Sequence, residues 1–347
     1  MADADASGGR EAAKGVSWFE LAKADTGHIP DHLVDACVRH GLTLIAQSGN
    51  TGLVSGSTPD GSGTQGILSL DRLTGICELD RVNRTVHAGA GLRLSDLNGR
   101  LEGEGLFFPI DLGADPRLGG MIATNTGGSR FLRYGDVRRN TLGLKVVLAD
   151  EQGTVLDLCS GLRKNNTGYD LKQLLIGSEG TLGVITAVAL RLFPRTDVRS
   201  VVLAAVESPA QALQLFEILF EQCGARLQAF EYFSGDCLDL VLAHAEGVQE
   251  PFAQRYPGYV LVELADTADE AALTNLLEHV IGAALERARH DRGAERRRQE
   301  VRLEHVDARR GEAKQHVALG VQPGDQRVVG VELEHRLALR HLLAAGL

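Results

Sequence analysis

The sequence has little of what marks a disulfide-stapled, membrane-spanning or nucleic-acid-binding protein. It contains five cysteines in 347 residues and no Cys-x-x-Cys pair, which argues against a zinc site built on cysteines. No apolar run reaches the roughly eighteen residues that a membrane-spanning helix requires. Acidic residues outnumber basic ones by 46 to 36, so the net charge of −10 excludes a general nucleic-acid binder.

Several common catalytic motifs are also missing. We find no GxxxxGK[ST] phosphate loop, no GxGxxG fingerprint, no GxSxG elbow and no HExxH zinc motif. The first fifteen residues are small and polar, without the charged-then-apolar order of a secretory signal. Because the odd, dispersed cysteines are typical of a reducing compartment, we expect a cytoplasmic protein, with peripheral docking on a membrane left open.

What the sequence has in excess is glycine, at 41 residues, gathered in loops. The central stretch, Asp111–Arg130, reads DLGADPRLGGMIATNTGGSR and contains two Gly-Gly pairs. An upstream loop (residues 47–57, QSGNTGLVSGS) and a downstream loop (residues 177–186, GSEGTLGVIT) resemble it in composition. Glycine allows positive φ and close approach of the backbone to a ligand. The alternative is that these are tight turns around buried strands with no ligand.

The upstream loop contains no Lys or Arg. Successive backbone N–H groups in such a loop form a concave array that suits a diphosphate. Any anion there would therefore be held by main-chain and hydroxyl donors rather than by a fixed cation.

Hydrophobic periodicity predicts strands and helices along most of the chain. Strands are expected at residues 42–46, 67–70, 75–80, 85–88, 144–149, 154–158, 184–192, 201–206, 230–233 and 259–264. Helices are expected from Pro30 to about residue 40, from a Ser95 N-cap to residue 104, and at residues 209–223, 237–243 and 269–285. This order predicts an α+β protein with a second α+β unit after Pro194.

The composition changes again after residue 285. Arginine becomes abundant, lysine nearly vanishes, and apolar periodicity is thin until residues 337–343. We divide the chain into an N-terminal segment (1–28), a first domain (29–197), a second domain (198–285) and an Arg-rich tail (286–347).

Three long motifs in a fixed order resemble the FAD-binding domain of the FAD-linked oxidase superfamily, of the vanillyl-alcohol oxidase type. They are SGNTGLVSG (48–56), PIDLGADPRLGGMIATNTGGSRFLRYGD (109–136) and LRKNNTGYDLKQLLIGSEGTLGVIT (162–186). The resemblance is to the D-lactate, glycolate and D-2-hydroxyglutarate dehydrogenase branch. It implies a two-subdomain FAD-binding domain followed by a partial α+β cap domain for the substrate.

The resemblance also implies the residues that contact FAD. They are Ser48, Gly49, Asn50, Thr51, Gly52, Leu53, Pro109, Asp111, Leu112, Gly119, Gly120, Thr124, Asn125, Gly127, Gly128, Gly180, Val184 and Ile185. Some relatives bind FAD covalently through a histidine in the first loop, where this chain has Asn50 and no histidine. We therefore expect noncovalent FAD.

Members of this branch end in a motif like GHxGDGNxH, which supplies metal ligands and a base. This motif does not occur here, so no metal ligand is predicted and the catalytic base is unassigned. We hypothesise that residues 286–347 are unrelated to the family, as a truncation or frameshift would produce.

The implied function is oxidation of a D-2-hydroxy acid (D-lactate, glycolate or D-2-hydroxyglutarate) to the 2-oxo acid. Electrons would pass to a quinone, a cytochrome or an electron-transfer flavoprotein rather than to NAD. Two alternatives stay open: an FAD-binding but catalytically incomplete fragment, and a transferase of the ether-lipid synthase kind in which flavin acts without net redox change.

Overall fold

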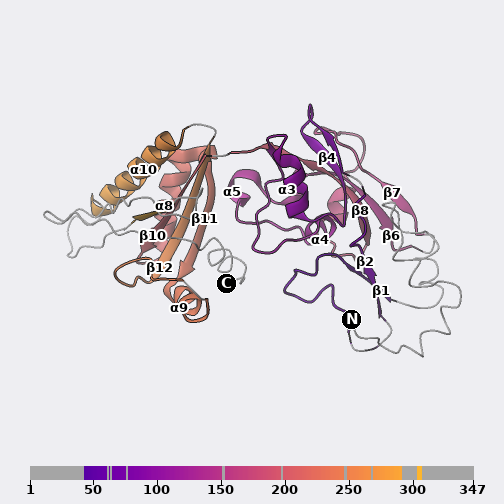
Figure 1. The fold of residues 1–347 in the computed structure, drawn as a ribbon, viewed down its shortest axis with the longest axis horizontal. Helices are drawn as coiled ribbons and strands as arrows, with labels where there is room; N and C mark the ends of the chain where they lie inside the picture. Colours follow the sequence, from indigo (N-terminus) through magenta and orange to yellow (C-terminus); the bar gives the residue numbers. More distant parts are fainter. Residues whose placement is uncertain are drawn as a thin grey trace. The chain divides into compact units, whose positions relative to one another are not determined.

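The computed structural model describes residues 43–60, 62, 65–75, 77–150, 153–196, 198–245, 248–266, 269–290 and 303–306. The helix predicted from Pro30, the N-terminal segment and most of the Arg-rich tail lie outside these residues. The chain divides into two compact units (Figure 1). Among the described residues, unit 1 comprises those up to Pro109, Ala114–Gly127 and Gly135–Arg195, and unit 2 comprises Ile110–Gly113, Gly128–Tyr134 and those from Thr196 onward.

Unit 1 is built on a five-stranded antiparallel sheet of order β3-β4-β8-β6-β7. Its strands are β3 (Cys77–Asp80), β4 (Thr85–Gly89), β6 (Thr141–Leu148), β7 (Val155–Asp157) and β8 (Gly183–Arg191). The central strand β8 is almost wholly buried, which explains its sequence VITAVAL, apolar except for the buried Thr186. The predicted β6–β7 hairpin is confirmed.

A small parallel sheet of β1 (Thr43–Gln47) and β2 (Gln65–Ser69) precedes the main sheet. The upstream loop is part of the connection between these two strands. Among its described residues, unit 1 also contains the β5 (Leu106–Phe107) and β9 (Phe193–Pro194) pair and four helices. The helices are α3 (Leu94–Glu102), α4 (Leu118–Ala123), α6 (Val137–Asn140) and α7 (Lys172–Leu175).

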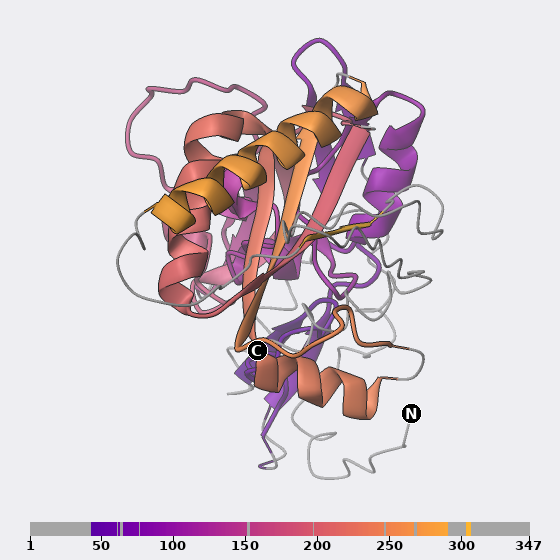
Figure 2. The same ribbon diagram turned by 90° about the vertical axis from the view of Figure 1, so that its left-hand side faces the viewer.

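Unit 2 is a four-stranded antiparallel sheet of order β11-β12-β10-β13. Its elements are α5 (Phe131–Tyr134), β10 (Val198–Val206), α8 (Pro209–Cys223), the 3-10 turn η1 (Gly224–Arg226), β11 (Leu227–Ser234), α9 (Gly235–His244), β12 (Gly258–Asp266), α10 (Glu270–His290) and β13 (Leu303–Val306). Helices α8 and α10 lie across one face of the sheet (Figure 2). Strand β13 pairs with β10 and falls inside the tail that we predicted to be unrelated.

The periodicity of the strands explains the layers of unit 2. Val202 of β10 and Val262 of β12 are opposite one another, and both pack under α8 and α10. Their neighbours Ala205 and Tyr259 point to the other face and pack with Phe252 beside α9. The predicted helix 209–223 is confirmed, with Ser208 capping it and Pro209 in its first turn.

No helix among the described residues is both long and apolar enough to cross a membrane.

Candidate functional site

The upstream and downstream loops and the central stretch meet at the short helix α4 of unit 1. The sequence left open whether residues 118–123 were turns around a strand; they form a helix with Leu118, Gly119, Met121 and Ile122 buried. The upstream loop attaches near the beginning of α4, and the downstream loop attaches at its end.

At its beginning, α4 is held by the end of strand β4. The N–H of Leu118 donates to the carbonyl of Leu92 at 2.9 Å, and the N–H of Gly119 donates to the carbonyl of Ala90 at 2.8 Å. A Cβ on Gly119 would lie 2.7 Å from the Cβ of Ala90. The glycine is therefore required for packing against the protein's own strand, and its N–H is not available to a ligand.

The upstream loop docks on the next residue of α4. The N–H of Gly120 donates to the Ser48 hydroxyl at 3.3 Å, and a Cβ on Gly120 would lie 2.9 Å from the Cβ of Ser48. Asn50 and Ser55 have positive φ angles of 49° and 59°, which curl the loop tip. Leu53 at this tip is 77% exposed.

The loop tip offers the donors that an anion needs. In the described part of the chain, the backbone N–H groups of residues 49–54 have no hydrogen-bond acceptor. Ser57 donates its hydroxyl to the Asn50 side chain at 2.7 Å, which stabilises the curl. Backbone N–H groups without acceptors among the described residues, in a loop that curls at Asn50 and Ser55, are the donors that a diphosphate requires, so the loop fits the group that the sequence predicted.

The downstream loop caps the other end of α4. The N–H of Gly177 donates to Ile122 at 3.2 Å, and the N–H of Glu179 donates to Ala123 at 3.0 Å. A Cβ on Gly180, whose φ is +82°, would meet the Cβ of Ala46 in strand β1 at 3.7 Å. The downstream loop therefore lies beside the strand that leads into the upstream loop. Val184 and Ile185 follow on β8, half-buried and buried.

Thr124 and Asn125 use their side chains inside the protein. Asn125 has a φ of 50°, accepts a hydrogen bond from the N–H of Arg138 at 3.1 Å and donates to Asp136 at 3.3 Å. The Thr124 hydroxyl lies 3.0 Å from that of Thr126 and donates to the carbonyl of Gly120. These two residues shape the turn after α4, and the exposed Thr124 remains open to solvent.

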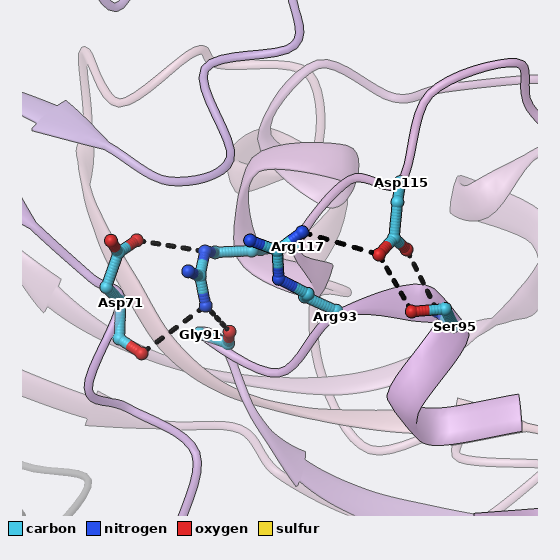
Figure 3. Close-up of polar contacts among 6 residues, drawn as sticks. All are labelled: Asp71, Gly91, Arg93, Ser95, Asp115 and Arg117. Carbon is cyan, nitrogen blue, oxygen red and sulfur yellow. Dashed lines mark hydrogen bonds and ion pairs between the residues drawn. The ribbon is translucent and has the colours of Figure 1, made fainter. Parts of the chain in front are cut away.

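The segment before α4 is fixed by two carboxylate contacts that the sequence pattern did not indicate (Figure 3). Arg117 is 14% exposed, pairs with Asp71 at 2.9 Å and donates to the carbonyl of Gly91 at 2.6 Å. Asp115 accepts hydrogen bonds from the N–H and the hydroxyl of Ser95 at 3.0 and 2.7 Å. Because α3 begins at Leu94 with Arg93 at the N-cap position, Ser95 lies inside the first turn and is not the N-cap that we predicted. The side chain of Arg93 makes no cap, and Asp115 supplies one from 20 residues away.

Three of the predicted residues belong to unit 2 instead. They are Asp111, Leu112 and Gly128; the other fifteen belong to unit 1. Asp111 pairs with Arg130 at 3.0 Å, and its carbonyl accepts the N–H of Ser129. A Cβ on Gly128 would lie 2.7 Å from that carbonyl, so this glycine too is required by the fold.

The arginines that follow the central stretch have internal partners. Arg133 donates to the carbonyl of Ala265 in unit 2. Arg138 donates to the carbonyls of Gln173 and Ile176 in unit 1, where it holds the chain that enters the downstream loop. Both side chains therefore have partners within their own units.

Comparison with known proteins supports the flavin assignment. Residues 31–158 match the family model described as an FAD binding domain. Mitochondrial D-2-hydroxyglutarate dehydrogenase of Rattus norvegicus is 40% identical over 270 residues, 76% of this chain and 49% of that protein. The Bos taurus protein of the same name is 42% identical over 259 residues, 73% of this chain and 46% of that protein.

A bacterial relative carries the same enzyme name. D-2-hydroxyglutarate dehydrogenase of Xanthomonas citri pv. viticola is 39% identical over 260 residues, 73% of this chain and 53% of that protein. The chain therefore spans about half the length of the curated relatives it matches.

The fold has a counterpart among solved structures. Alkyldihydroxyacetonephosphate synthase aligns with a TM-score of 0.59 at 18% identity, over 75% of this chain and 50% of that chain. A likeness at that identity shows the fold alone. The predicted α+β fold, with an FAD-binding domain of the vanillyl-alcohol oxidase type, is confirmed.

One prediction was wrong. The rat and cattle relatives are named as mitochondrial proteins, which overturns the expected cytoplasmic location. Dispersed cysteines argue only against an oxidising compartment, and that argument does not separate the cytoplasm from other reducing compartments.

Proposed function

Because the chain carries an FAD-binding domain of the vanillyl-alcohol oxidase type, we propose that it binds FAD noncovalently and oxidises a D-2-hydroxy acid to the 2-oxo acid. FAD, when bound, supplies the acceptor for the two electrons of this oxidation. The observation that carries the proposal is the meeting of the upstream and downstream loops at α4, in a chain about 40% identical to D-2-hydroxyglutarate dehydrogenases. D-2-hydroxyglutarate is therefore the substrate we favour over D-lactate and glycolate.

The residues proposed to hold the cofactor differ in how they act. The N–H groups of residues 49–54, which have no acceptor within the described structure, donate to the diphosphate. Ser48 and Gly120 fix the position of that loop, and Glu179 and Gly180 place the downstream loop beside it. We keep all eighteen predicted residues as the proposed contact set, and residues 29–197 and 198–285 as the proposed domains.

Anaerobic reduction of the bound flavin tests the activity. The purified full chain, loaded with FAD, is mixed with D-2-hydroxyglutarate, and absorbance at about 450 nm is followed. L-2-hydroxyglutarate is the matched control, since it has the same charge and atoms. Bleaching by the D enantiomer alone supports the proposal. The rates of bleaching by D-lactate and glycolate then show which of the three acids is the preferred substrate. Bleaching by both enantiomers at equal rates would contradict it.

A flavin that binds but is not reduced by any of these acids would support the alternative of an FAD-binding, catalytically incomplete chain. If bleaching occurs, reoxidation by a quinone analogue, a cytochrome or an electron-transfer flavoprotein identifies the acceptor, which we propose is not NAD.

Noncovalent binding has its own test. The loop contains Asn50 where some relatives of the resembled family have a flavin-linked histidine. We expect trichloroacetic acid to precipitate a colourless protein and to leave the yellow flavin in the supernatant. Colour that stays with the pellet would contradict noncovalent binding.

A further inference from the structure

None of the eighteen residues proposed to contact FAD lies in the first half of the third sequence motif. Residues Leu162–Gln173 line a cavity of about 800 Å³ in unit 1, together with α6, the beginning of β6 and the residues that follow β7. None of the eighteen residues proposed to contact FAD lines it. The volume is in the range of sites that hold a small organic molecule.

The lining of this cavity is cationic in a protein that is acidic overall. Five basic and three acidic residues line it, whereas the whole chain has a net charge of −10. The three carboxylates already have partners. Asp170 pairs with Lys172 at 2.6 Å, Asp157 lies 3.8 Å from Lys145, and Asp136 accepts the N–H of Arg139 at 2.9 Å.

The arginines of the cavity lack such counter-charges. Within the described residues, Arg163 donates only to the carbonyl of Asn83, and the side chains of Arg139 and Lys164 have no hydrogen-bond or ion-pair partner. Their positive charges are therefore balanced by no carboxylate of the described chain.

A third arginine adjoins this pair. Arg191, at the end of β8, places its guanidinium 4.7 Å from the ring centre of Phe193, and its buried Nε has no acceptor in the described structure. Its pKa is lowered, first by burial and then by the charges of Arg163 and Arg139, which disfavour its protonated form. Repulsion of this kind is relieved when an anion binds among the cations.

Neutral donors surround the same space. Ser160, Asn165, Asn166 and Thr167 line the cavity, and the Asn165 side-chain oxygen accepts the N–H of Thr167 at 3.1 Å. That bond fixes the amide plane and leaves its NH₂ group as a donor. Guanidinium forks with amide and hydroxyl donors form the combination that recognises clustered anionic oxygens.

We propose that this cavity, lined by Arg139, Arg163 and Lys164, is a second ligand site of the protein, for a small molecule with clustered anionic oxygens. Phosphate esters and polycarboxylates share this chemistry. The site is separate from the FAD cradle, so its occupancy does not depend on the proposed oxidation.

Titration calorimetry on the full, FAD-loaded chain tests the proposal with pyrophosphate in one arm and citrate in the other. We expect at least one of them to bind with a Kd below about 1 mM at low salt and more weakly at high salt. Whichever of the two anions binds more tightly shows whether the site prefers a phosphate ester or a polycarboxylate. Arg139→Gln/Arg163→Gln should weaken that binding at least about 10-fold. Arg100→Gln, on the exposed face of α3 outside the cavity, is the matched control and should not change it.

Thermal unfolding without added anion gives a second readout. Loss of a structural contact would lower the unfolding temperature, whereas loss of an unfavourable charge should raise it. Because the charge of Arg139 disfavours the protonated form of Arg191, Arg139→Gln should raise the unfolding temperature slightly, and it should reduce the rise that pyrophosphate or citrate produces. Flavin content and flavin reduction, measured on the same samples, report separately on the FAD site and on the proposed oxidation. Absence of binding by both anions, or equal binding by the double variant, would overturn the proposal.

Discussion

The side-chain oxygen of Ser48 accepts a hydrogen bond from the backbone N–H of Gly120 across 72 positions of sequence. This bond joins the upstream loop to helix α4, and the missing side chain of Gly120 is what permits it. The Cβ of any larger residue would lie 2.9 Å from the Cβ of Ser48, closer than carbon atoms approach without strain. The glycines of the central stretch therefore act by letting segments of the protein approach one another.

Gly120→Ala tests this relationship. We expect a loss of about 1–3 kcal/mol in unfolding free energy, because the extra methyl overpacks the contact, and a lower flavin content. Ser48→Gly in the Gly120→Ala background removes the colliding Cβ and should restore part of the stability, whereas Ser48→Ala keeps that Cβ and should not. Urea unfolding of the FAD-loaded protein measures the difference.

Gly99→Ala is the matched control for that series. Gly99 lies in helix α3, and a Cβ added to it would have no atom within 4 Å outside its own helix turn. Because alanine favours the helix over glycine, the variant should gain about 0.5–1 kcal/mol. If Gly120→Ala were as stable as Gly99→Ala, the close contact with Ser48 would not exist in solution.

Arg117→Met tests the contacts that fix the segment before α4. The side chain is 14% exposed and its guanidinium donates to the carbonyl of Gly91, so its loss leaves a carbonyl without its charged partner. We expect a cost of about 2–3 kcal/mol. Arg81→Met removes an ion pair to Glu104 whose arginine is 72% exposed, and should cost less than about 1 kcal/mol. Equal costs in chemical denaturation would refute the structural role of Arg117.

Asp115→Ala tests which residue caps helix α3. If Asp115 is the cap, its removal should cost about 1 kcal/mol, and Ser95→Ala should cost less, because the N–H of residue 95 keeps its acceptor. Asp96→Ala, in the same turn, is the control for the helix dipole and should cost a few tenths of a kcal/mol. A larger effect at Ser95 than at Asp115 would restore Ser95 as the N-cap.

The sequence predicted features that depend on neighbouring residues, and it did not predict features that depend on contacts between distant residues. Strand and helix positions followed from periodicity, and helix 209–223 was predicted to the residue because Ser208 and Pro209 mark its start locally. The Asp115 cap was not predictable, since it joins residues that are adjacent only after folding. The glycine motif correctly predicted a close approach to the backbone. Sequence patterns cannot say whether the approaching group is a ligand or, as at Gly119, the protein's own Ala90.

The division of the central stretch between the two units was equally hidden from the sequence. Asp111 and Gly128 lie within a continuous motif, yet both belong with unit 2, where the carbonyl of Asp111 accepts the N–H of Ser129. A linear assignment of domains gives every residue before 198 to the first domain. Local sequence patterns carry no information about which unit such a short segment joins, because long-range contacts alone determine it.

The thiols of Cys159 and Cys223 have similar pKa values but differ in how accessible they are to a reagent, so their alkylation rates distinguish the two effects. Burial raises the pKa of both to about 11, so little of either is thiolate at pH 8. Cys159 lines the cavity of unit 1, whereas Cys223 is 2% exposed in the core between α8 and the sheet of unit 2. Brief iodoacetamide treatment at pH 8, with mass spectrometry of the peptides, should leave both nearly unlabelled.

Raising the pH toward 10 should then distinguish the two residues. The thiolate fraction of each rises about 10-fold per pH unit below its pKa, but only Cys159 has a path to the reagent. We expect labelling of Cys159 to increase steeply while Cys223 stays protected until the protein unfolds. Rapid labelling of Cys159 at pH 8 would mean that its surroundings are more hydrated than the structure shows, and equal labelling at pH 10 would mean that the core of unit 2 opens.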